Sequence, residues 1–210
     1  MVAKEAIDTV LCTRHGDGVQ QKLSAATVGI AGLGGLGSNI AVHLSRLGIG
    51  HLVLADFDKV DLSNLNRQHY FLRHLGKWKT EAMKEQLLDI NPYLTYEIHT
   101  VRVTDSNACG IFKDCDIICE AFDNADQKAM LIETILTDLP GIPLISGSGM
   151  AGSRSANDIR TLHRFSNLYL CGDGTSDISS GECLMSPRVG VCAAHEATMV
   201  MRLLLGICEP

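Results

Sequence analysis

The segment Gly32-Leu33-Gly34-Gly35-Leu36-Gly37 has the spacing G-x-G-x-x-G. It follows an apolar run, residues 26–31, that predicts a short buried strand, and it precedes a pattern in which Ile40, Leu44 and Leu47 share one helical face. Glycine permits a tight turn and a close approach of backbone to ligand, and the N-terminus of the next helix favours phosphate. The segment therefore predicts a nucleotide-binding turn between a strand and a helix.

An aspartate follows the glycine turn at the spacing that is typical of nucleotide-binding folds. A second apolar run, residues 51–55, predicts another buried strand, and Asp56 follows it, 19 residues after Gly37. A carboxylate at this position typically binds ribose hydroxyls. NAD and ATP both offer a ribose and phosphates, so these features predict nucleotide binding without choosing between them.

The rest of the chain alternates strands with helices. This order implies right-handed βαβ units, and so an α/β, Rossmann-like three-layer fold with a mainly parallel sheet. Asn124 is placed to cap one of these helices. A segment rich in Gly, Ser and Asp, residues 146–187, contains two short runs that we expect to extend the sheet with antiparallel strands near the C-terminus. The predicted strands cover residues 96–103, 116–121, 142–146, 158–162 and 168–171; the predicted helices end before Asn91, near Pro140 and at Gly206.

Length and charge limit the organisation and the partners. The 210 residues show no internal repeat or linker, so we expect an N-terminal helical arm, residues 1–23, and a single domain over residues 24–210. The net charge of −6 argues against non-specific nucleic-acid binding. No apolar run approaches the roughly 18 residues of a membrane span, and no secretory signal is recognisable. These observations predict a cytoplasmic protein that binds neither nucleic acid nor membrane.

Eight cysteines suggest either metal binding or a packing role. The chain contains no C-x-x-C pair, and its histidines show no ligand spacing. We therefore interpret the cysteines as small buried apolar residues and expect no zinc site.

Several ordered motifs follow the second strand. The run from Asp56 to Gln68 includes Ser63-Asn64-Leu65-Asn66-Arg67, and downstream come Gly76-Lys77-Trp78-Lys79, then Asn91-Pro92, then Phe122-Asp123-Asn124. Together they resemble the ThiF/MoeB/HesA family, prokaryotic relatives of ubiquitin-activating enzymes, over roughly residues 20–150. The later segment, from Gly172-Asp173-Gly174 to Ser186-Pro187-Arg188-Val189-Gly190, is similar to the short ThiF-type branch of that family.

The resemblance implies an activity. Family members use ATP and Mg²⁺ to adenylate the C-terminal Gly-Gly carboxylate of a small ubiquitin-like sulfur carrier protein and release pyrophosphate. The similarity to the ThiF-type branch also implies a pathway, namely sulfur supply for the thiazole of thiamine. A homodimer is the family expectation, and the apolar C-terminal helix is compatible with one.

The resemblance assigns roles to matching residues. Arg67 and Lys79 would hold the phosphates, Asp123 would hold Mg²⁺, and Asp56 would bind the ribose. An anionic carboxylate attacking a polyanion needs cations and positioning more than a base, which agrees with these residue types. The remaining residues expected to line the nucleotide site are Gly32, Gly34, Gly35, Gly37, Asp58, Ser63, Asn64, Gln68 and Asn124.

Some features leave alternatives open. Family members place an N-terminal arginine in the neighbouring subunit's ATP site, and Arg14 is the candidate here, although its flanking sequence differs from that of longer members. No motif assigns Cys171, Cys183 or Cys192 a catalytic role. Two other functions remain: an NAD-dependent oxidoreductase, which would leave Arg67, Lys79 and Asp123 without a shared purpose, and a non-catalytic nucleotide sensor.

Overall fold

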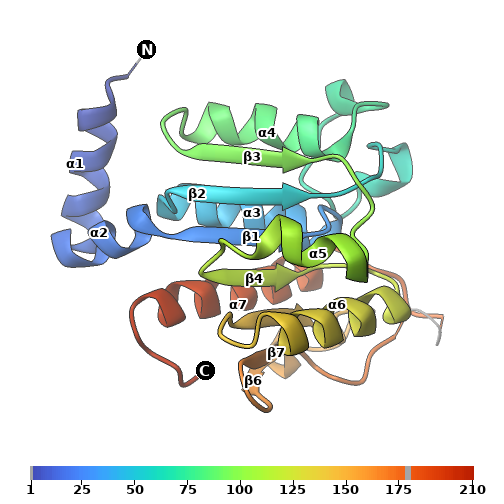
Figure 1. The fold of residues 1–210 in the computed structure, drawn as a ribbon. Coiled ribbons are helices and arrows are strands. Elements are labelled where there is room, and N and C mark those ends of the chain that lie inside the picture. The colour runs from blue at the N-terminus through green and yellow to red at the C-terminus, as the bar shows by residue number, and fades with distance from the viewer. Residues whose placement is uncertain (1, 178–180) are drawn as a thin grey trace.

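The computed structural model describes residues 2–177 and 181–210. Within them, seven strands form one sheet in the order β3-β2-β1-β4-β5-β7-β6 (Figure 1), and neighbouring strands are parallel except for β6 and β7. The strands are β1 (Thr27–Ala31), β2 (His51–Ala55), β3 (Thr95–His99), β4 (Ile117–Glu120), β5 (Leu144–Gly147), β6 (Arg160–His163) and β7 (Leu168–Gly172). The helices are α1 (Lys4–His15), α2 (Asp17–Ala25), α3 (Gly35–Leu47), α4 (Lys79–Ile90), α5 (Asp105–Phe112), α6 (Ala125–Asp138) and α7 (Ser186–Leu204).

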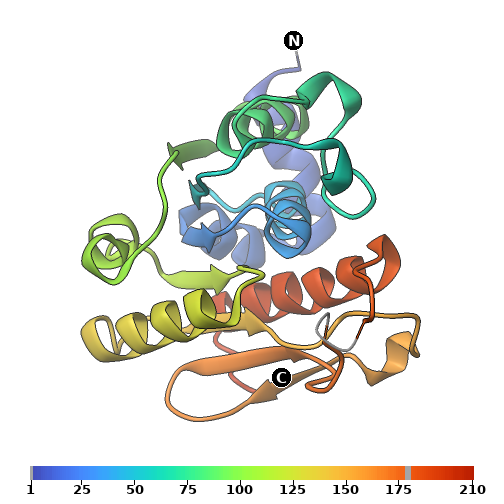
Figure 2. The ribbon, with the colours of Figure 1, turned by 90° about the vertical axis from the view of Figure 1, so that its right-hand side faces the viewer.

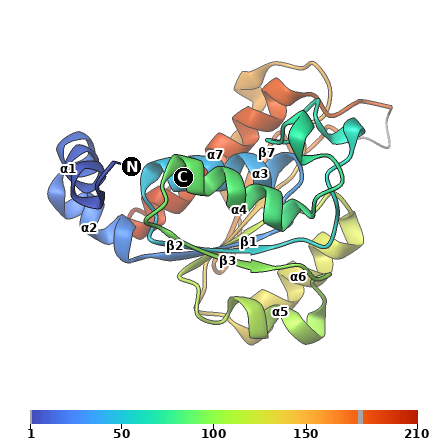
Figure 3. The same ribbon diagram turned by 90° about the horizontal axis from the view of Figure 1, so that it is seen from above.

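Helices cover both faces of the sheet (Figure 3): α3, α4 and α7 lie on one face, and α5 and α6 on the other. Successive strand residues point to opposite faces, so each strand supplies two cores. Ile30 and Leu54 belong to the core under α3, α4 and α7, whereas their neighbours Ala31 and Ala55 belong to the core under α5 and α6. The predicted three-layer α/β fold is confirmed.

Three details differ from the sequence prediction. Strand β3 ends at His99 rather than at Val103, and α5 follows it unpredicted. The start of α5 is fixed by Asn107, whose Oδ1 accepts a hydrogen bond from the Thr104 N–H at 2.8 Å. Strand β7 joins β5 in parallel, so β6 is the antiparallel strand at this edge. The sequence predicts both strands as extensions of the sheet. The segment between β5 and β7 contains β6, which brings the chain back to the end of the sheet where β5 starts, so β7 runs parallel to β5.

The N-terminal helices lie at the edge of the sheet where the strands begin (Figure 1). Helix α1 contributes no buried residue, whereas Leu23 in α2 is completely buried in the core. No helix among the described residues has the length and apolar character required to cross a membrane.

Candidate nucleotide-binding site

A cavity of about 470 Å³ opens at the edge of the sheet where the parallel strands end. Figure 2 looks onto this edge. The sheet register aligns Ala31 with Ala55 on one side and with Glu120 on the other, so the residues after β1, β2 and β4 emerge together. The strand order reverses direction between β1 and β4, and open α/β sheets bind ligands at such a switch point.

The glycine turn closes tightly beneath the cavity. Gly32 has a φ of +93°, and a Cβ added to it would lie 2.9 Å from the Ala121 carbonyl oxygen. A Cβ on Gly37 would lie 1.8 Å from the Gly32 carbonyl oxygen, so Gly37 is required for the turn itself. Gly32, Gly34 and Gly35 line the cavity. The first turn of α3 therefore faces the cavity with its backbone N–H groups, the arrangement that favours an anion.

Asp56 connects the glycine turn to the end of β2. Its carboxylate accepts hydrogen bonds from the Leu33 N–H at 2.6 Å and from the Asp58 N–H at 2.7 Å. Burial raises the pKa of Asp56, while the Lys79 charge and the two backbone donors oppose that rise. Each carboxylate oxygen has a second lone pair, so Asp56 still has acceptor capacity toward a ligand hydroxyl.

Lys79 places a buried cation at the cavity. It begins α4, and its side chain is 7% exposed. The Nζ lies 2.9 Å from Asp58 Oδ2, whose side chain is 48% exposed, and both residues line the cavity. A lysine in the first turn of a helix opposes the helix dipole, so the helix does not account for its position. If a ligand oxygen replaced Asp58 Oδ2 as the partner of Lys79, the Lys79 ammonium group would remain paired.

Arg67 supplies a second cation from the long crossover between β2 and α4. Its NH1 group donates to the Ser63 carbonyl at 3.1 Å and to Asn66 Oδ1 at 2.8 Å. Its stem lies against Gly35, where a Cβ would come within 3.6 Å of Arg67 Cγ. The buried Arg67 Nε has no hydrogen-bond partner among the described residues. The guanidinium therefore lies beside the α3 N-terminus with unused donors.

Hydrogen bonds connect the crossover between β2 and α4 to the glycine turn, residues 32–37. Tyr70, buried, donates from its hydroxyl to the Leu33 carbonyl at 2.8 Å, and Asn39 Nδ2 donates to the Gly35 carbonyl at 2.7 Å and to the Arg67 carbonyl at 3.2 Å. Gln68 lines the cavity with a buried Oε1 that is unpaired within residues 2–177 and 181–210. These contacts hold the Arg67 backbone beside the glycine turn.

Asp123 and Asn124 follow β4 on the other side of the switch point. Asp123 is exposed and lines the cavity. Asn124 also lines it, and its Oδ1 caps α6 by accepting from the Gln127 N–H at 3.0 Å. An exposed carboxylate beside a phosphate-sized anion site is the donor that Mg²⁺ prefers, so the residues present fit that ion.

The structure thus brings together ten of the predicted residues around one cavity: Gly32, Gly34, Gly35, Asp56, Asp58, Arg67, Gln68, Lys79, Asp123 and Asn124. The other four predicted residues do not line the cavity: Gly37, Ser63, Asn64 and Arg14. Ser63 and Asn64 form a short 3-10 turn in which Asp61 accepts from the Ser63 N–H at 2.9 Å and Asn64 accepts from the Asp61 N–H at 3.0 Å. Gly37 lies under the turn. Exposed Arg14 is in α1, at the opposite edge of the sheet (Figure 1).

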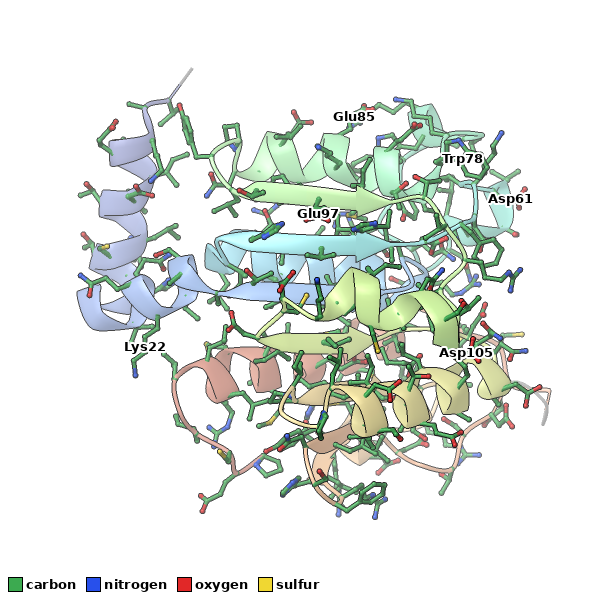
Figure 4. All side chains as sticks on the ribbon, viewed as in Figure 1. Lys22, Asp61, Trp78, Glu85, Glu97 and Asp105 are labelled. Carbon is green, nitrogen blue, oxygen red and sulfur yellow. The ribbon has the colours of Figure 1, made fainter. Side chains whose placement is uncertain are left out.

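Figure 4 shows how far the crossover reaches. Asp61 and Trp78 lie beyond the strand ends, whereas Lys22 lies at the opposite edge, where the strands begin. No residue of α1 is among the described residues that line the cavity.

A second wall of the cavity was not predicted. It consists of the end of β5 and the loop after it (Gly147–Ala151), the loop after β7 (Gly174–Asp177 and Leu184), and Val189 in α7. Asp173 fastens these loops: its Oδ1 accepts from the Thr175 and Ser176 N–H groups at 2.8 and 2.7 Å, and its Oδ2 pairs with Arg188 at 2.5 Å. Burial opposes ionisation of Asp173, but the two backbone donors and Arg188 lower its pKa to about 2. The Gly172-Asp173-Gly174 motif was the available signal.

A third feature lies behind this wall. Glu196 in α7 is completely buried, and neither of its carboxylate oxygens has a hydrogen-bond partner in the part of the chain that is described. Burial raises its pKa well above the ordinary value; Lys128 opposes this effect and Glu120 adds to it. Glu120, by contrast, accepts from Lys128 Nζ at 2.8 Å and from the Phe122 N–H at 2.7 Å. Glu196 therefore differs from Glu120 in having no hydrogen-bond donor to its carboxylate among the described residues.

Four of the eight cysteines are buried, two are exposed, and Cys12 and Cys109 are half-buried. All eight lie within the described residues, and none of them forms a disulfide bond there. Cys115, Cys119, Cys171 and Cys192 are buried, and burial raises the pKa of each of these thiols, so the packing interpretation fits these four. Cys183 and Cys208 are exposed, and the interpretation is wrong for them. His195 lies beside Thr161, 3.0 Å from its hydroxyl.

Comparisons with known proteins agree with this geometry. The sequence model of the ThiF family matches residues 9–210. A relative described as adenylyltransferase and sulfurtransferase uba4, from Aspergillus fumigatus, is 39% identical over 132 residues, which cover 62% of this chain and 26% of that protein. The protein of the same description from Eremothecium gossypii is 33% identical over 90% of this chain and 43% of its own length. The chain therefore spans less than half the length of each of these relatives.

Solved structures share the fold. The E. coli tRNA N6-threonylcarbamoyladenosine dehydratase TcdA, in complex with ATP, superposes with a TM-score of 0.86 at 20% identity, covering 98% of this chain and 97% of that one. E. coli MccB, with succinimide, superposes with a TM-score of 0.73 at 25% identity over 91% of this chain and 60% of that one.

Proposed function

Since the chain belongs to the ThiF family, we propose that it is an ATP- and Mg²⁺-dependent adenylyltransferase that activates the C-terminal glycine carboxylate of a small ubiquitin-like sulfur carrier protein. The observation that carries the proposal is the pair of cations at the cavity. Lys79 and Arg67 gather beside the N-terminus of α3 in a chain of net charge −6. Cations beside the N–H groups of a helix N-terminus form an arrangement that suits the phosphates of a nucleotide.

The proposed reaction needs positioning and charge rather than a base. A C-terminal carboxyl group has an ordinary pKa of about 3.5, so it is already an anion at neutral pH. One of its oxygens forms a bond to the α-phosphorus of ATP while the bond from that phosphorus to the bridging oxygen of the β-phosphate breaks. The electron pair leaves with pyrophosphate, and the carrier becomes an acyl adenylate. No proton is transferred.

Each group of residues has one task in this scheme. Lys79 and Arg67 hold the phosphates and offset the negative charge where the two anions meet, and Asp56 accepts from the ribose hydroxyls. Asp123 would hold Mg²⁺, which supplies charge neutralisation at the phosphates when bound. Removal of a preorganised cationic donor of this kind typically lowers the rate by about 10²–10³-fold.

The relatives support this assignment without fixing the carrier. Two are named adenylyltransferase and sulfurtransferase, and a structure of the same fold was solved with ATP. We propose sulfur supply for the thiamine thiazole as the pathway, because the segment from Gly172 to Gly190 is similar to the short ThiF-type branch. A homodimer, with Arg14 reaching the partner's cavity, is part of the same proposal.

The test is carrier-dependent exchange of pyrophosphate into ATP. Carriers ending in Gly-Gly, including a ThiS-like one, are added singly to the wild-type chain, Asp123→Ala, Arg67→Ala and Asp126→Ala. Asp126 is an exposed α6 residue outside the cavity and serves as the matched control. We expect exchange with one carrier, lost in the first two variants and retained in the third.

Other outcomes reject parts of the proposal. Undiminished exchange in Asp123→Ala or Arg67→Ala overturns the site. ATP binding without exchange for any carrier favours a nucleotide sensor. Binding of NADH in place of Mg-ATP in calorimetry favours the oxidoreductase.

A further inference from the structure

An arginine lies over an aromatic ring in the lining of the cavity. The Arg102 guanidinium carbon lies 3.8 Å from the centre of the Phe57 ring, and both residues line the cavity. Phe57 is 40% exposed and Arg102 is exposed. An exposed phenyl ring at the end of a strand is unfavourable in water, and none of the roles assigned above uses either residue.

The strand order places this pair away from the phosphates. The glycine turn follows β1, Asp56 follows β2, and Arg102 follows β3, which is the next strand outward. A nucleotide with its phosphates at the α3 N-terminus and its ribose at Asp56 continues in the direction of β3. The group that comes after the ribose in that direction is the base.

The neighbouring walls suit a flat, mostly apolar group. Val103 is 3% exposed, and Phe122 packs against the same core, under α5 and α6. Both line the cavity together with Val101. The cations Arg67 and Lys79 approach from the other face of the sheet, on the side of α3 and α4. The cavity therefore has a polar end and an apolar end, and Arg102 lies at the apolar one.

We propose that Arg102, which lies over the Phe57 ring, is a positioning residue for the nucleobase of ATP. This rests on the function proposed above. A guanidinium plane stacks on π-systems and offers donors at its edge, so it can cover one face of a base while Phe57 keeps the plane in place. A lysine in the same position keeps the charge but loses the plane.

Calorimetry with three ligands tests this role: ATP, AMP and inorganic tripolyphosphate, the last lacking the base. The variants are Arg102→Ala, Arg102→Lys and Arg73→Ala. Arg73 is the matched control, because its guanidinium carbon lies 4.5 Å from the Phe71 ring centre outside the cavity. We expect Arg102→Ala to weaken ATP and AMP by the same factor, about tenfold, and to leave tripolyphosphate unchanged. Arg102→Lys should not restore the loss, and Arg73→Ala should match the wild type.

The contrary results are distinct. Weaker tripolyphosphate binding in Arg102→Ala, or recovery in Arg102→Lys, would make Arg102 a phosphate ligand and overturn the proposal. Unchanged AMP affinity would overturn it as well. A wild-type chain that binds none of the three ligands would instead overturn the proposed function.

Discussion

The two walls of the cavity are built by different means. The wall from β1 to α4 is made of residues close together in sequence, from Gly32 to Lys79, and its contacts run from side chain to nearby backbone. The wall from the loops after β5 and β7 depends on partners far apart in the chain: Arg188 pairs with Asp173, 15 residues away, and donates to the Ser155 carbonyl, 33 residues away. The first wall holds the two cations Arg67 and Lys79, and the second depends on a buried ion pair for its shape.

The largest expected effect lies in the second wall. Replacing Asp173 with Asn leaves the Arg188 charge buried at 5% exposure without its counter-ion, and such a loss typically costs about 3–5 kcal/mol of unfolding free energy. The pKa of Asp173 is about 2, below its unfolded value of 3.8. Its stabilisation is therefore present above about pH 4 and is lost as the pH falls through about 2. Urea unfolding at pH 7 and at pH 2.5 measures both effects.

The matched control for Asp173→Asn is an exposed ion pair between the same two loops, those after β5 and β7. Glu182 pairs with Arg154 at 3.1 Å, with side chains 25% and 44% exposed. Glu182→Gln should cost no more than about 1 kcal/mol, because solvent screens the pair. Equal losses for the two variants would contradict the claim that the buried pair shapes this wall.

The next effect lies in the first wall and concerns rate rather than stability. Lys79→Met should lower carrier-dependent exchange by about 10²–10³-fold. Its folding should change little, because Asp58, the partner left behind, is half exposed and becomes hydrated. Lys77→Met is the matched control: Lys77 is exposed and pairs with Glu85 outside the cavity. A loss of exchange that parallels a loss of thermal stability would show that Lys79 is structural.

A smaller effect, a pH-dependent change in melting temperature, is expected for Glu196, which lies behind the second wall. The pKa of buried Glu196 is raised, so its contribution to stability is fully present below its ordinary value of 4.5 and is lost as the pH rises toward the folded-state value. Glu196→Gln removes that dependence. The melting temperature of the variant relative to wild type should therefore rise between pH 5 and pH 8. Exposed Glu133 in α6 provides the control substitution, and a difference that does not vary with pH would refute the assignment.

The smallest expected effect concerns Asn64, because the family resemblance and the structure give this residue different roles. The family resemblance assigns Asn64 to the nucleotide, whereas the structure uses its Oδ1 for the Asp61 N–H and leaves it outside the cavity lining. Asn64→Ala should change the ATP dissociation constant by less than about threefold, and it should cost about 1 kcal/mol as a lost cap. A tenfold loss of ATP affinity at unchanged stability would return Asn64 to the site.

The first wall was predictable and the second was not, for a physical reason. Gly32, Asp56 and Lys79 follow or begin regular elements, so alternating strands and helices bring them to one edge of the sheet. The position of Arg188 depends on where α7 packs, and no local pattern encodes its partner Asp173. Arg102 was missed because β3 was predicted four residues too long, which placed it within a strand rather than at the cavity. Cys183 and Cys208 were misassigned because composition does not report burial.

Detection of the activated carboxylate itself is the most direct test of the central claim. Each Gly-Gly carrier is incubated with the chain and Mg-ATP, hydroxylamine is added to trap an acyl adenylate, and the intact carrier mass is measured. We predict a C-terminal hydroxamate on one carrier, with wild-type chain and with Lys77→Met, but not with Lys79→Met. An unmodified carrier in every case, from a chain that binds ATP, would contradict the account.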